Sequence, residues 1–339
     1  MDVLTPLEPR PARQWLSVVV PVYNEEAGLA QFHARLGAVL DRLGADFGAE
    51  VVYVNDGSRD DSMARLVQLH AADARVQIVD LSRNFGKEVA LSAGLDYSRG
   101  DAVIVIDADL QDPPELIPDM VRAWEAGHDI VSMRRASRAN ESWFKKATAS
   151  AFYRAIGRIG EIEIPADVGD FRLLSRRAVH ALSLFPERTR FMKGLFASIG
   201  FPSAEIVYDR DGRYAGDSKW NYWELWNFAL EGITSFSVGP LKVASYVGIA
   251  TAISAFAYGV FVIGKTLLFG EPVRGYPTLL VVVLFLGGLQ LMALGIIGEY
   301  LARMFIEVKS RPLYLVQRCL PSTQSPQPPA AAVDPWTSR

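Results

Sequence analysis

The first half of the chain alternates short, continuously apolar runs with segments whose apolar residues recur at helical spacing. Four apolar runs end in polar clusters: LSVVVPVYNEE (16–26), EVVYVNDGSRDDS (50–62), VQIVDLSRNFGKE (76–88) and DAVIVIDADLQDPPE (101–115). Residues 27–43 carry apolar side chains on one helical face: Leu29, Phe32, Leu36 and Leu40. Runs that are apolar on both faces are typical of buried parallel strands. The order strand, helix, strand, helix therefore predicts a doubly wound, mostly parallel α/β sheet.

Three later segments extend this pattern. Residues 128–135 predict a fifth strand, 167–182 a strand followed by a helix, and 204–220 a last strand and a loop. In such sheets ligands bind at the carboxyl ends of the strands, which is where each of the four polar clusters stands. The clusters are therefore expected to converge on one site.

Two long segments of the second half, 243–264 and 276–298, contain no charged residue. Each exceeds the roughly 18–20 residues that a helix needs to cross a bilayer. Residues 265–275 join them, which predicts a transmembrane hairpin. Basic residues flank the pair and are scarce in its connecting loop, so both termini are expected in the cytoplasm. Before the first span, an aromatic stripe suits an interfacial helix, with core packing as the alternative reading; it consists of Trp220, Trp223 and Trp226.

Composition narrows the function classes. A formal net charge of −3 argues against a nucleic-acid binder, which usually has a basic surface. The single cysteine, Cys319, allows no internal disulfide and favours a cytosolic-facing location. The four histidines are far apart in sequence and show no zinc-ligand spacing. Residues 1–13 have no apolar core of a signal peptide, so none is expected.

The fourth strand ends in two aspartates one residue apart. Asp107 and Asp109, with the neutral oxygen of Gln111, are hard ligands that suit Mg²⁺ or Mn²⁺ and leave positions for phosphate oxygens. Solvation of a strand end is the alternative reading, since an isolated DxD is common. Neither a GxGxxG after the first strand nor a GxxxxGK[ST] is present, which excludes a dinucleotide fingerprint and a P-loop.

PVYNEE, VNDGSRDDS, DLSRNFGKE and DADLQDPPE, in this order, resemble the GT-A nucleotide-sugar glycosyltransferases, and more narrowly the polyprenyl-phosphate glycosyltransferases. This family includes dolichol-phosphate mannose synthases and bactoprenol glucosyltransferases. The resemblance runs from about residue 18 to 316 and takes in DFRLLSRRAV, RYAGDSKW and the two apolar segments.

The resemblance implies a role for each matching position. The nucleotide would be bound by Pro21, Tyr23, Glu25, Asp56, Lys87, Asp107, Ala108 and Asp109. The metal would be held by Asp107, Asp109 and Gln111. Acceptor phosphate contacts would come from Arg134, Arg138, Lys145, Lys146, Arg213 and Lys219, and the catalytic set would be Asp107, Asp109, Arg134, Arg213 and Lys219. Asp56 could equally cap a turn, and Lys87 or Asp170 could be a base.

The implied reaction transfers a hexose, with glucose from UDP-glucose as first choice, to undecaprenyl phosphate with inversion. A divalent cation, together with arginine and lysine side chains, would stabilise the negative charge that develops on the departing nucleoside diphosphate. The acceptor phosphomonoester is already an anion, so it needs less help from a base than a hydroxyl does. The enzyme would work at the cytoplasmic face of a bacterial plasma membrane, as a homo-oligomer.

Several alternatives stay open. GDP-mannose or another UDP-sugar would require few changes to the pocket. A processive polysaccharide synthase is disfavoured because no QxxRW is present. A catalytically silent membrane scaffold with the same fold is the rival from another class.

The expected organisation has six parts. A loose N-terminus (1–14) precedes the GT-A domain (15–219), juxtamembrane amphipathic helices (220–240) and two transmembrane helices (241–306). A C-terminal strand (307–318, centred on RPLYLV) is expected to add to a neighbour's sheet edge, before a disordered tail (319–339).

Overall fold

The computed structural model describes residues 14–44, 46–135, 168–185, 187–188, 190, 192–208, 239–269 and 275–324. These residues form two compact units, each described by itself. One consists of the residues up to 208 together with 312–324, and the other of residues 239–311.

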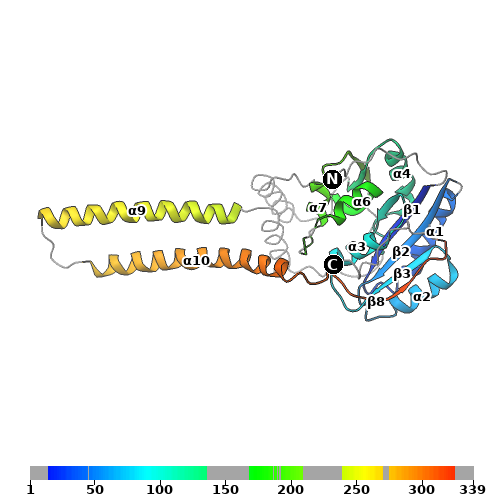
Figure 1. Ribbon diagram of the computed structural model, residues 1–339, viewed down its shortest axis with the longest axis horizontal. Helices are drawn as coiled ribbons and strands as arrows, with labels where there is room; N and C mark the ends of the chain where they lie inside the picture. The colour runs from blue at the N-terminus through cyan, green and yellow to red at the C-terminus, as the bar shows by residue number, and fades with distance from the viewer. Residues whose placement is uncertain are drawn as a thin grey trace. The chain divides into compact units, whose positions relative to one another are not determined.

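The first unit contains an eight-stranded mixed sheet in the order β7-β5-β6-β4-β1-β2-β3-β8 (Figure 1). Its strands are β1 (Gln14–Val22), β2 (Phe47–Asn55), β3 (Val76–Leu81), β4 (Ala102–Val105), β5 (Ile130–Arg135), β6 (Val168–Ser175), β7 (Ser203–Tyr208) and β8 (Val316–Leu320). The four strands β4-β1-β2-β3 are parallel, which confirms the predicted doubly wound core. β6 is antiparallel to both β4 and β5, and β8 is antiparallel to β3.

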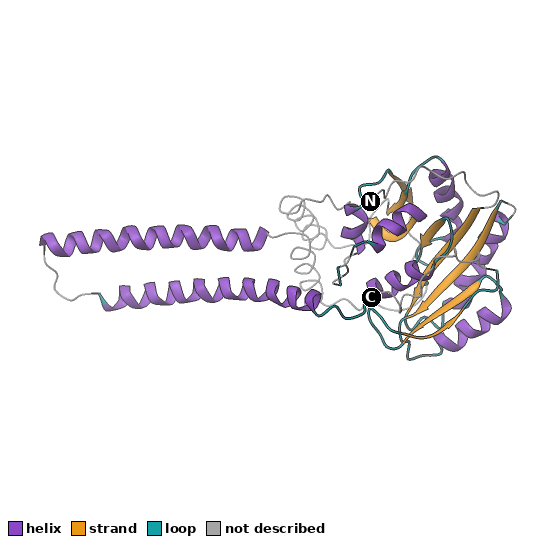
Figure 2. Ribbon diagram, in the orientation of Figure 1, coloured by secondary structure: helices purple, strands orange, loops and turns teal. Residues whose placement is uncertain are grey.

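Helices cover both faces of this sheet (Figure 2). They are α1 (Leu29–Leu43), α2 (Ser62–Ala72), α3 (Lys87–Tyr97), η1 (Pro114–Leu116), α4 (Ile117–Glu125), α6 (Arg176–Ser183) and α7 (Met192–Ser198). The predicted stripe of α1 is buried: Phe32 and Leu36 belong to one core with Val18, Tyr53 and Ile104 of the sheet. On the opposite face α3 packs closely, because a Cβ on Gly94 would lie 2.2 Å from a methyl carbon of Val19.

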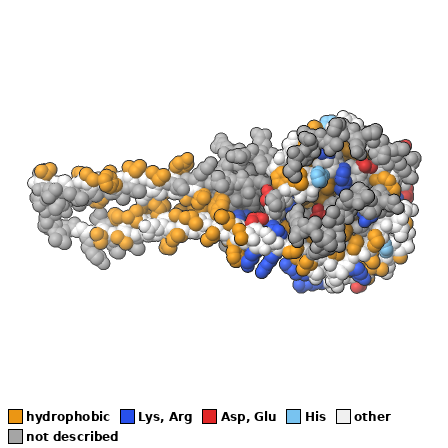
Figure 3. Space-filling view, in the orientation of Figure 1, with side chains coloured by type: hydrophobic (Ala, Val, Ile, Leu, Met, Phe, Trp, Pro, Cys, Tyr) orange, Lys and Arg blue, Asp and Glu red, His pale blue; other side chains and the backbone are white. Residues whose placement is uncertain are grey.

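The second unit is a hairpin of two long helices, α9 (Gly239–Phe269) and α10 (Tyr276–Val308). Figure 3 shows hydrophobic side chains along both helices, and α9 and α10 expose large apolar residues such as Phe256 (75%) and Leu291 (72%). Among the described residues one segment, Phe285–Val308, is long and apolar enough to cross a membrane, and a shorter apolar segment spans Tyr246–Tyr258. Apolar surface that faces no protein is what a lipid environment favours.

The C-terminal strand was placed wrongly by the sequence analysis. Residues 307–308 end α10, and the strand is Val316–Leu320 rather than RPLYLV. It pairs antiparallel with β3 of its own chain, so its sheet partner is internal. The expected disorder from residue 319 was also wrong at its start, since Ser322 Oγ donates to the Ala74 carbonyl and Thr323 N donates to the same oxygen. The edge of β3 decides this register, for example by pairing Ile78 with Leu320, and the local sequence pattern does not reveal it.

Candidate active site at the carboxyl ends of the strands

The parallel strands bring three predicted polar clusters to one edge of the sheet. Val22 is in register with Asn55, and Val19 with Val105, so the turns after β1, β2 and β4 begin side by side. The backbone nitrogen of Asp56 donates to the Val22 carbonyl at 2.9 Å, which continues the pairing into the turns. Three of the four predicted clusters therefore lie at the same edge of the sheet.

The turn after β4 presents its oxygens in a constrained conformation. Asp109 Oδ1 accepts a hydrogen bond from the backbone nitrogen of Gln111 at 3.1 Å. Between them Leu110 has φ +62°, a left-handed conformation that is costly for a bulky residue and is found mostly at functional sites. Ala108 and Leu110 point into the core, whereas Asp107 and Asp109 are partly exposed.

Asp107 is contacted by a lysine from α3, the helix that precedes β4 in the chain. Lys87 Nζ lies 2.7 Å from each carboxylate oxygen of Asp107 and 2.6 Å from Oδ2 of Asp170 on β6. Burial opposes the charge of Lys87, but the two carboxylates outweigh it and raise the pKa of this lysine. Burial raises the pKa of Asp107, and the Lys87 ammonium opposes that shift. Lys87 is therefore charged at neutral pH and unsuited to act as a base.

Asp56 anchors the loop that leads into α3. Its carboxylate accepts hydrogen bonds from the backbone nitrogens of Phe85, at 2.7 Å, and Gly86, at 2.9 Å. The residue is 3% exposed, and burial raises the pKa of Asp56 while these bonds oppose the shift. The adjacent Gly57 has φ +63°, and a Cβ there would lie 2.5 Å from the backbone of Arg83. The structure thus accounts for Asp56 as a loop anchor.

The turn after β1 is joined to the turn after β2. Asn24, at φ +57°, accepts a hydrogen bond from the nitrogen of Arg59 at 2.9 Å, and the nitrogen of Glu25 donates one to Ser62 Oγ at 2.8 Å. Tyr23 is 40% exposed beside these bonds, while Pro21 lies within β1 and is part-buried. Tyr23 therefore has the exposure that a nucleotide contact requires.

Other predicted residues are not brought to this point. Arg134 forms an ion pair with Glu205 of β7 at 3.1 Å, and no contact with the Asp107 cluster is described for it. Several predicted residues lie outside the described residues: Arg138, Lys145, Lys146, Arg213, Lys219 and the three tryptophans Trp220, Trp223 and Trp226.

Two features near the site were missed by the sequence analysis. Arg172 of β6 is 3% exposed; it donates to the Gly169 carbonyl at 2.7 Å and stacks 3.8 Å from the ring centroid of Phe196. Burial lowers its pKa to about 10, against the raising effect of Asp170 and Glu88. Tyr208 donates to the buried Asp112. Arg172 and Asp170 are two positions apart on β6, so their side chains lie on the same face of the sheet. This spacing is the sequence signal that could have linked the two residues.

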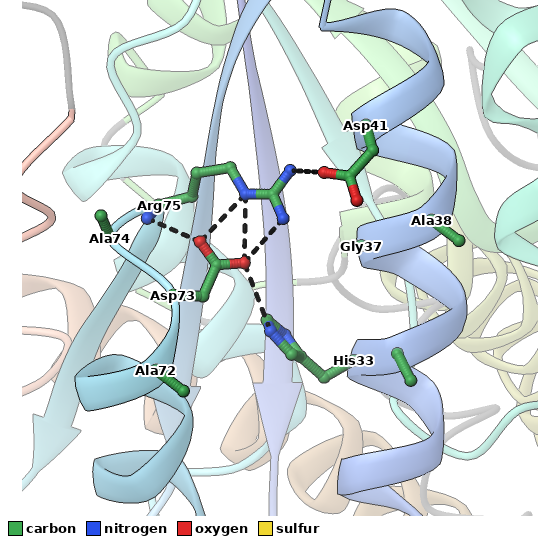
Figure 4. Close-up of a pocket in the computed structure, with 9 residues that line it drawn as sticks. His33, Gly37, Ala38, Asp41, Ala72, Asp73, Ala74 and Arg75 are labelled. Carbon is green, nitrogen blue, oxygen red and sulfur yellow. Dashed lines mark hydrogen bonds and ion pairs between the residues drawn. The ribbon is translucent and has the colours of Figure 1, made fainter.

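A pocket of about 500 Å³ lies between α1 and the segment that joins α2 to β3 (Figure 4). Asp73 pairs with His33, at 3.4 Å, and with Arg75, at 2.8 Å, and Arg75 also pairs with Asp41 at 2.7 Å. Asp73 and Arg75 precede β3, so the pocket is at the opposite end of the strands from Asp107. Its charges face one another, which is typical of a structural network.

The donor set after β4 fits a cation that arrives with a phosphorylated ligand. Among the described residues, no group of three or more His, Cys, Asp or Glu side chains could hold a metal by itself. Asp107, Asp109 and Gln111 offer two carboxylates and an amide. Mg²⁺ in nucleotide enzymes is bound in this way, by one or two carboxylates with substrate phosphates and water completing the shell.

Comparison with known proteins agrees with this geometry. Residues 17–183 match the model of Glycosyl transferase family 2, and residues 239–304 match the GtrB C-terminal hairpin. An uncharacterized glycosyltransferase of Synechocystis is 54% identical over 89% of this chain and 94% of its own length. A prophage-derived bactoprenol glucosyl transferase of Shigella flexneri is 46% identical over 89% of this chain and 97% of its own. A prophage bactoprenol glucosyl transferase homolog of Escherichia coli is 45% identical over 89% of this chain and 98% of its own length.

The family match at residues 17–183 includes the turns that carry Asp56, Lys87, Asp107 and Asp109, and the match at residues 239–304 covers most of the helical hairpin. The chain is therefore a glycosyltransferase with a GT-A fold and belongs to glycosyl transferase family 2, with the hairpin of the GtrB type at its C-terminal end.

Proposed function

We propose that the protein transfers glucose from a nucleotide sugar, with UDP-glucose as first choice, to polyprenyl phosphate. The observation that carries the proposal is the similarity over 89% of the chain to a bactoprenol glucosyl transferase, combined with the oxygens of Asp107 and Asp109 at the carboxyl ends of the strands. The product would be a lipid-linked monosaccharide with inverted configuration at the anomeric carbon.

The reaction requires charge stabilisation more than proton transfer. An oxygen of the acceptor phosphate attacks the anomeric carbon, and the bond from that carbon to the diphosphate breaks with its electron pair on the diphosphate. Asp107, Asp109 and Gln111 would hold Mg²⁺ or Mn²⁺, which when bound neutralises charge on the leaving diphosphate. The acceptor is already an anion, so a strong base is not needed.

Residues of this chain would then divide the binding work. Tyr23 and Glu25, with Pro21 and Ala108, would line the nucleotide pocket beside the loop that Asp56 anchors. Asp170 is held by Lys87 at 2.6 Å, which favours a role in positioning this lysine over the role of a base. Phosphate contacts are proposed for the basic residues Arg134, Arg138, Lys145, Arg213 and Lys219.

The hairpin would keep the catalytic domain at the cytoplasmic face of a bacterial plasma membrane, where the acceptor's phosphate lies at the surface. The exposed apolar side chains of α9 and α10 support two membrane spans, with both termini in the cytoplasm. A homo-oligomer is part of the same proposal.

The test uses detergent-purified protein, undecaprenyl phosphate, Mg²⁺ or Mn²⁺, and a panel of radiolabelled UDP- and GDP-sugars. We expect label from UDP-glucose to enter the organic phase. Asp109→Ala should reduce that rate by about 100-fold or more, the scale of losing one group that stabilises transition-state charge. Asp119→Ala is the matched control, because this aspartate is 42% exposed on α4 and, among the residues that the structure describes, pairs with Arg122 one helical turn away.

Three other outcomes are informative. Transfer from GDP-mannose or another UDP-sugar, lost in Asp109→Ala, would keep the reaction and replace the sugar. Equal loss in Asp119→Ala would mean that Asp109 has no special role. A folded protein that transfers from no donor would support the silent scaffold.

A further inference from the structure

Lys87 occupies the position at which a cation would have to meet Asp107. Its ammonium contacts both oxygens of Asp107 at 2.7 Å, so the face on which this carboxylate would chelate an ion is already taken. The same ammonium contacts Asp170 at 2.6 Å. Mg²⁺ binds carboxylate oxygens at about 2.0–2.1 Å, and the charge of such an ion would repel an ammonium held at the same oxygens.

The place of Lys87 in the fold is not explained by helix stability. It is the first residue of α3, directly after Gly86, where the positive end of the helix dipole disfavours a cation. Its side chain is 43% exposed overall, whereas Asp107 and Asp170, the two side chains that its ammonium contacts, are only 20% and 15% exposed. The two carboxylates that it bridges come from the turn after β4 and from β6, 20 and 83 residues away. Its position is therefore explained by the site it enters.

We propose that Lys87 is a resident cation of the donor site, which neutralises Asp107 and Asp170 until a divalent ion displaces it from Asp107. The inference deepens the proposed function and rests on its assignment of Asp107 as a metal ligand. When the divalent ion displaces Lys87 from Asp107, the ammonium stays beside Asp170 and loses its contact with the second carboxylate. The diphosphate of the donor supplies a replacement anion, so the ion enters with the nucleotide far more readily than it enters alone.

The experiment measures Mn²⁺ binding to the detergent-purified full-length protein, by calorimetry or by the spin resonance of free Mn²⁺, with and without UDP. For the wild type we expect Mn²⁺ to bind at least about tenfold more weakly without UDP than with it. Lys87→Met should tighten nucleotide-free Mn²⁺ binding by about tenfold or more, because Asp107 is then released. The gain should vanish when Asp107→Asn is added to Lys87→Met.

Two variants separate this competition from a change in overall charge. Lys87→Arg keeps a cation at the carboxylates and should bind Mn²⁺ as weakly as the wild type. Arg83→Met removes a positive charge from the same loop, where the guanidinium stacks 4.2 Å from the ring centroid of Phe85, and should leave Mn²⁺ binding unchanged. Tightening in Arg83→Met equal to that in Lys87→Met would overturn the proposal.

The inference and the proposed function fail in different ways. If Mn²⁺ binds with UDP and is lost in Asp109→Ala, the donor site stands; a folded Lys87→Met that binds nucleotide-free Mn²⁺ no tighter than the wild type then overturns the inference alone. If the wild type binds Mn²⁺ with equal affinity in the presence and absence of UDP, this result also overturns the inference alone, and no variant is needed to show it. No Mn²⁺ binding in any form, with or without UDP, overturns both.

Discussion

The carboxylate of Asp56 accepts a hydrogen bond from the backbone nitrogen of Gly86 at 2.9 Å, which fixes the end of β2 to the start of α3. Gly86 immediately precedes Lys87, so this bond also fixes the residue that reaches Asp107. The turn after β2 therefore positions a side chain that acts at the end of β4.

Substitution of Asp56 distinguishes its role as an anchor of the loop before α3 from a direct contact with the nucleotide. Asp56→Ala leaves the part-buried nitrogens of Phe85 and Gly86 without their acceptor, which should cost about 1–3 kcal/mol of stability. Asp56→Asn keeps one acceptor oxygen and should cost less. Thermal unfolding in detergent checks both. An unchanged midpoint in Asp56→Ala together with a raised KM for the donor would instead support a direct contact with the base or ribose.

Arg172 is not one of the proposed metal ligands, but we expect it to contribute to the free energy of unfolding. Arg172→Met removes the bond to the Gly169 carbonyl and the stacking on Phe196, which should cost about 1–3 kcal/mol. The control is Arg177→Met, whose guanidinium is 47% exposed and pairs with Asp129; it should cost about 0–1 kcal/mol. Equal shifts of the unfolding midpoint in the two variants would contradict this assignment.

The segment after the hairpin is bonded to α3. Tyr314 donates to Asp96 at 2.8 Å, and burial followed by the Asp96 charge raises the pKa of Tyr314. Tyr314→Phe should lower stability by about 1 kcal/mol and make β8 more sensitive to limited proteolysis. Tyr246→Phe, at a tyrosine that is 69% exposed in α9, is the control. Unchanged proteolysis in Tyr314→Phe would show that the bond from Tyr314 to Asp96 does not hold β8 in place.

The elements that local pattern predicts are those whose burial is uniform. Val103 and Ile104 point to opposite faces of β4, and both are 0% exposed. The aspartates that follow stand at the carboxyl end of the strand, where parallel sheets bind their ligands. The bridge from Lys87 to Asp170 joins residues 83 apart, and neither residue's neighbours in sequence encode it. β8 likewise depends on a free edge of β3. The sequence thus reveals which strand ends are polar but not which of their charges meet.

The apolar helices should tolerate charge poorly if they lie in lipid. Leu294 is 62% exposed within the segment Phe285–Val308. Leu294→Arg replaces a residue that favours insertion with one that costs about 2.5–3.5 kcal/mol near the centre of a span. We expect a lower fraction of the protein to resist alkaline extraction from membranes. Gln317→Arg, on an exposed position of β8, adds the same charge and should have no effect. Equal extraction of Leu294→Arg and the wild type would place this part of α10 outside the hydrocarbon.

The pocket beneath α1 predicts a pH dependence of folding that is separate from catalysis. His33 Nδ1 is 3.0 Å from the buried Tyr53 hydroxyl, and its Nε2 is 3.4 Å from Asp73. Burial lowers the pKa of His33 from its ordinary 6.5; Asp73 opposes this effect and Arg75 adds to it. The unfolded chain therefore binds a proton at this residue before the folded chain does.

Stability from this histidine is complete above pH 6.5 and is lost as pH falls from there toward the lowered pKa. The unfolding midpoint should therefore decline on acidification from about pH 7.5 to 5.5, and His33→Gln should flatten that decline. The carboxyl of Asp73, whose pKa is lowered by its bonds to Arg75 against the effect of burial, titrates below this window and does not confound the comparison. A decline of the same size in His33→Gln would assign the pH dependence to another group.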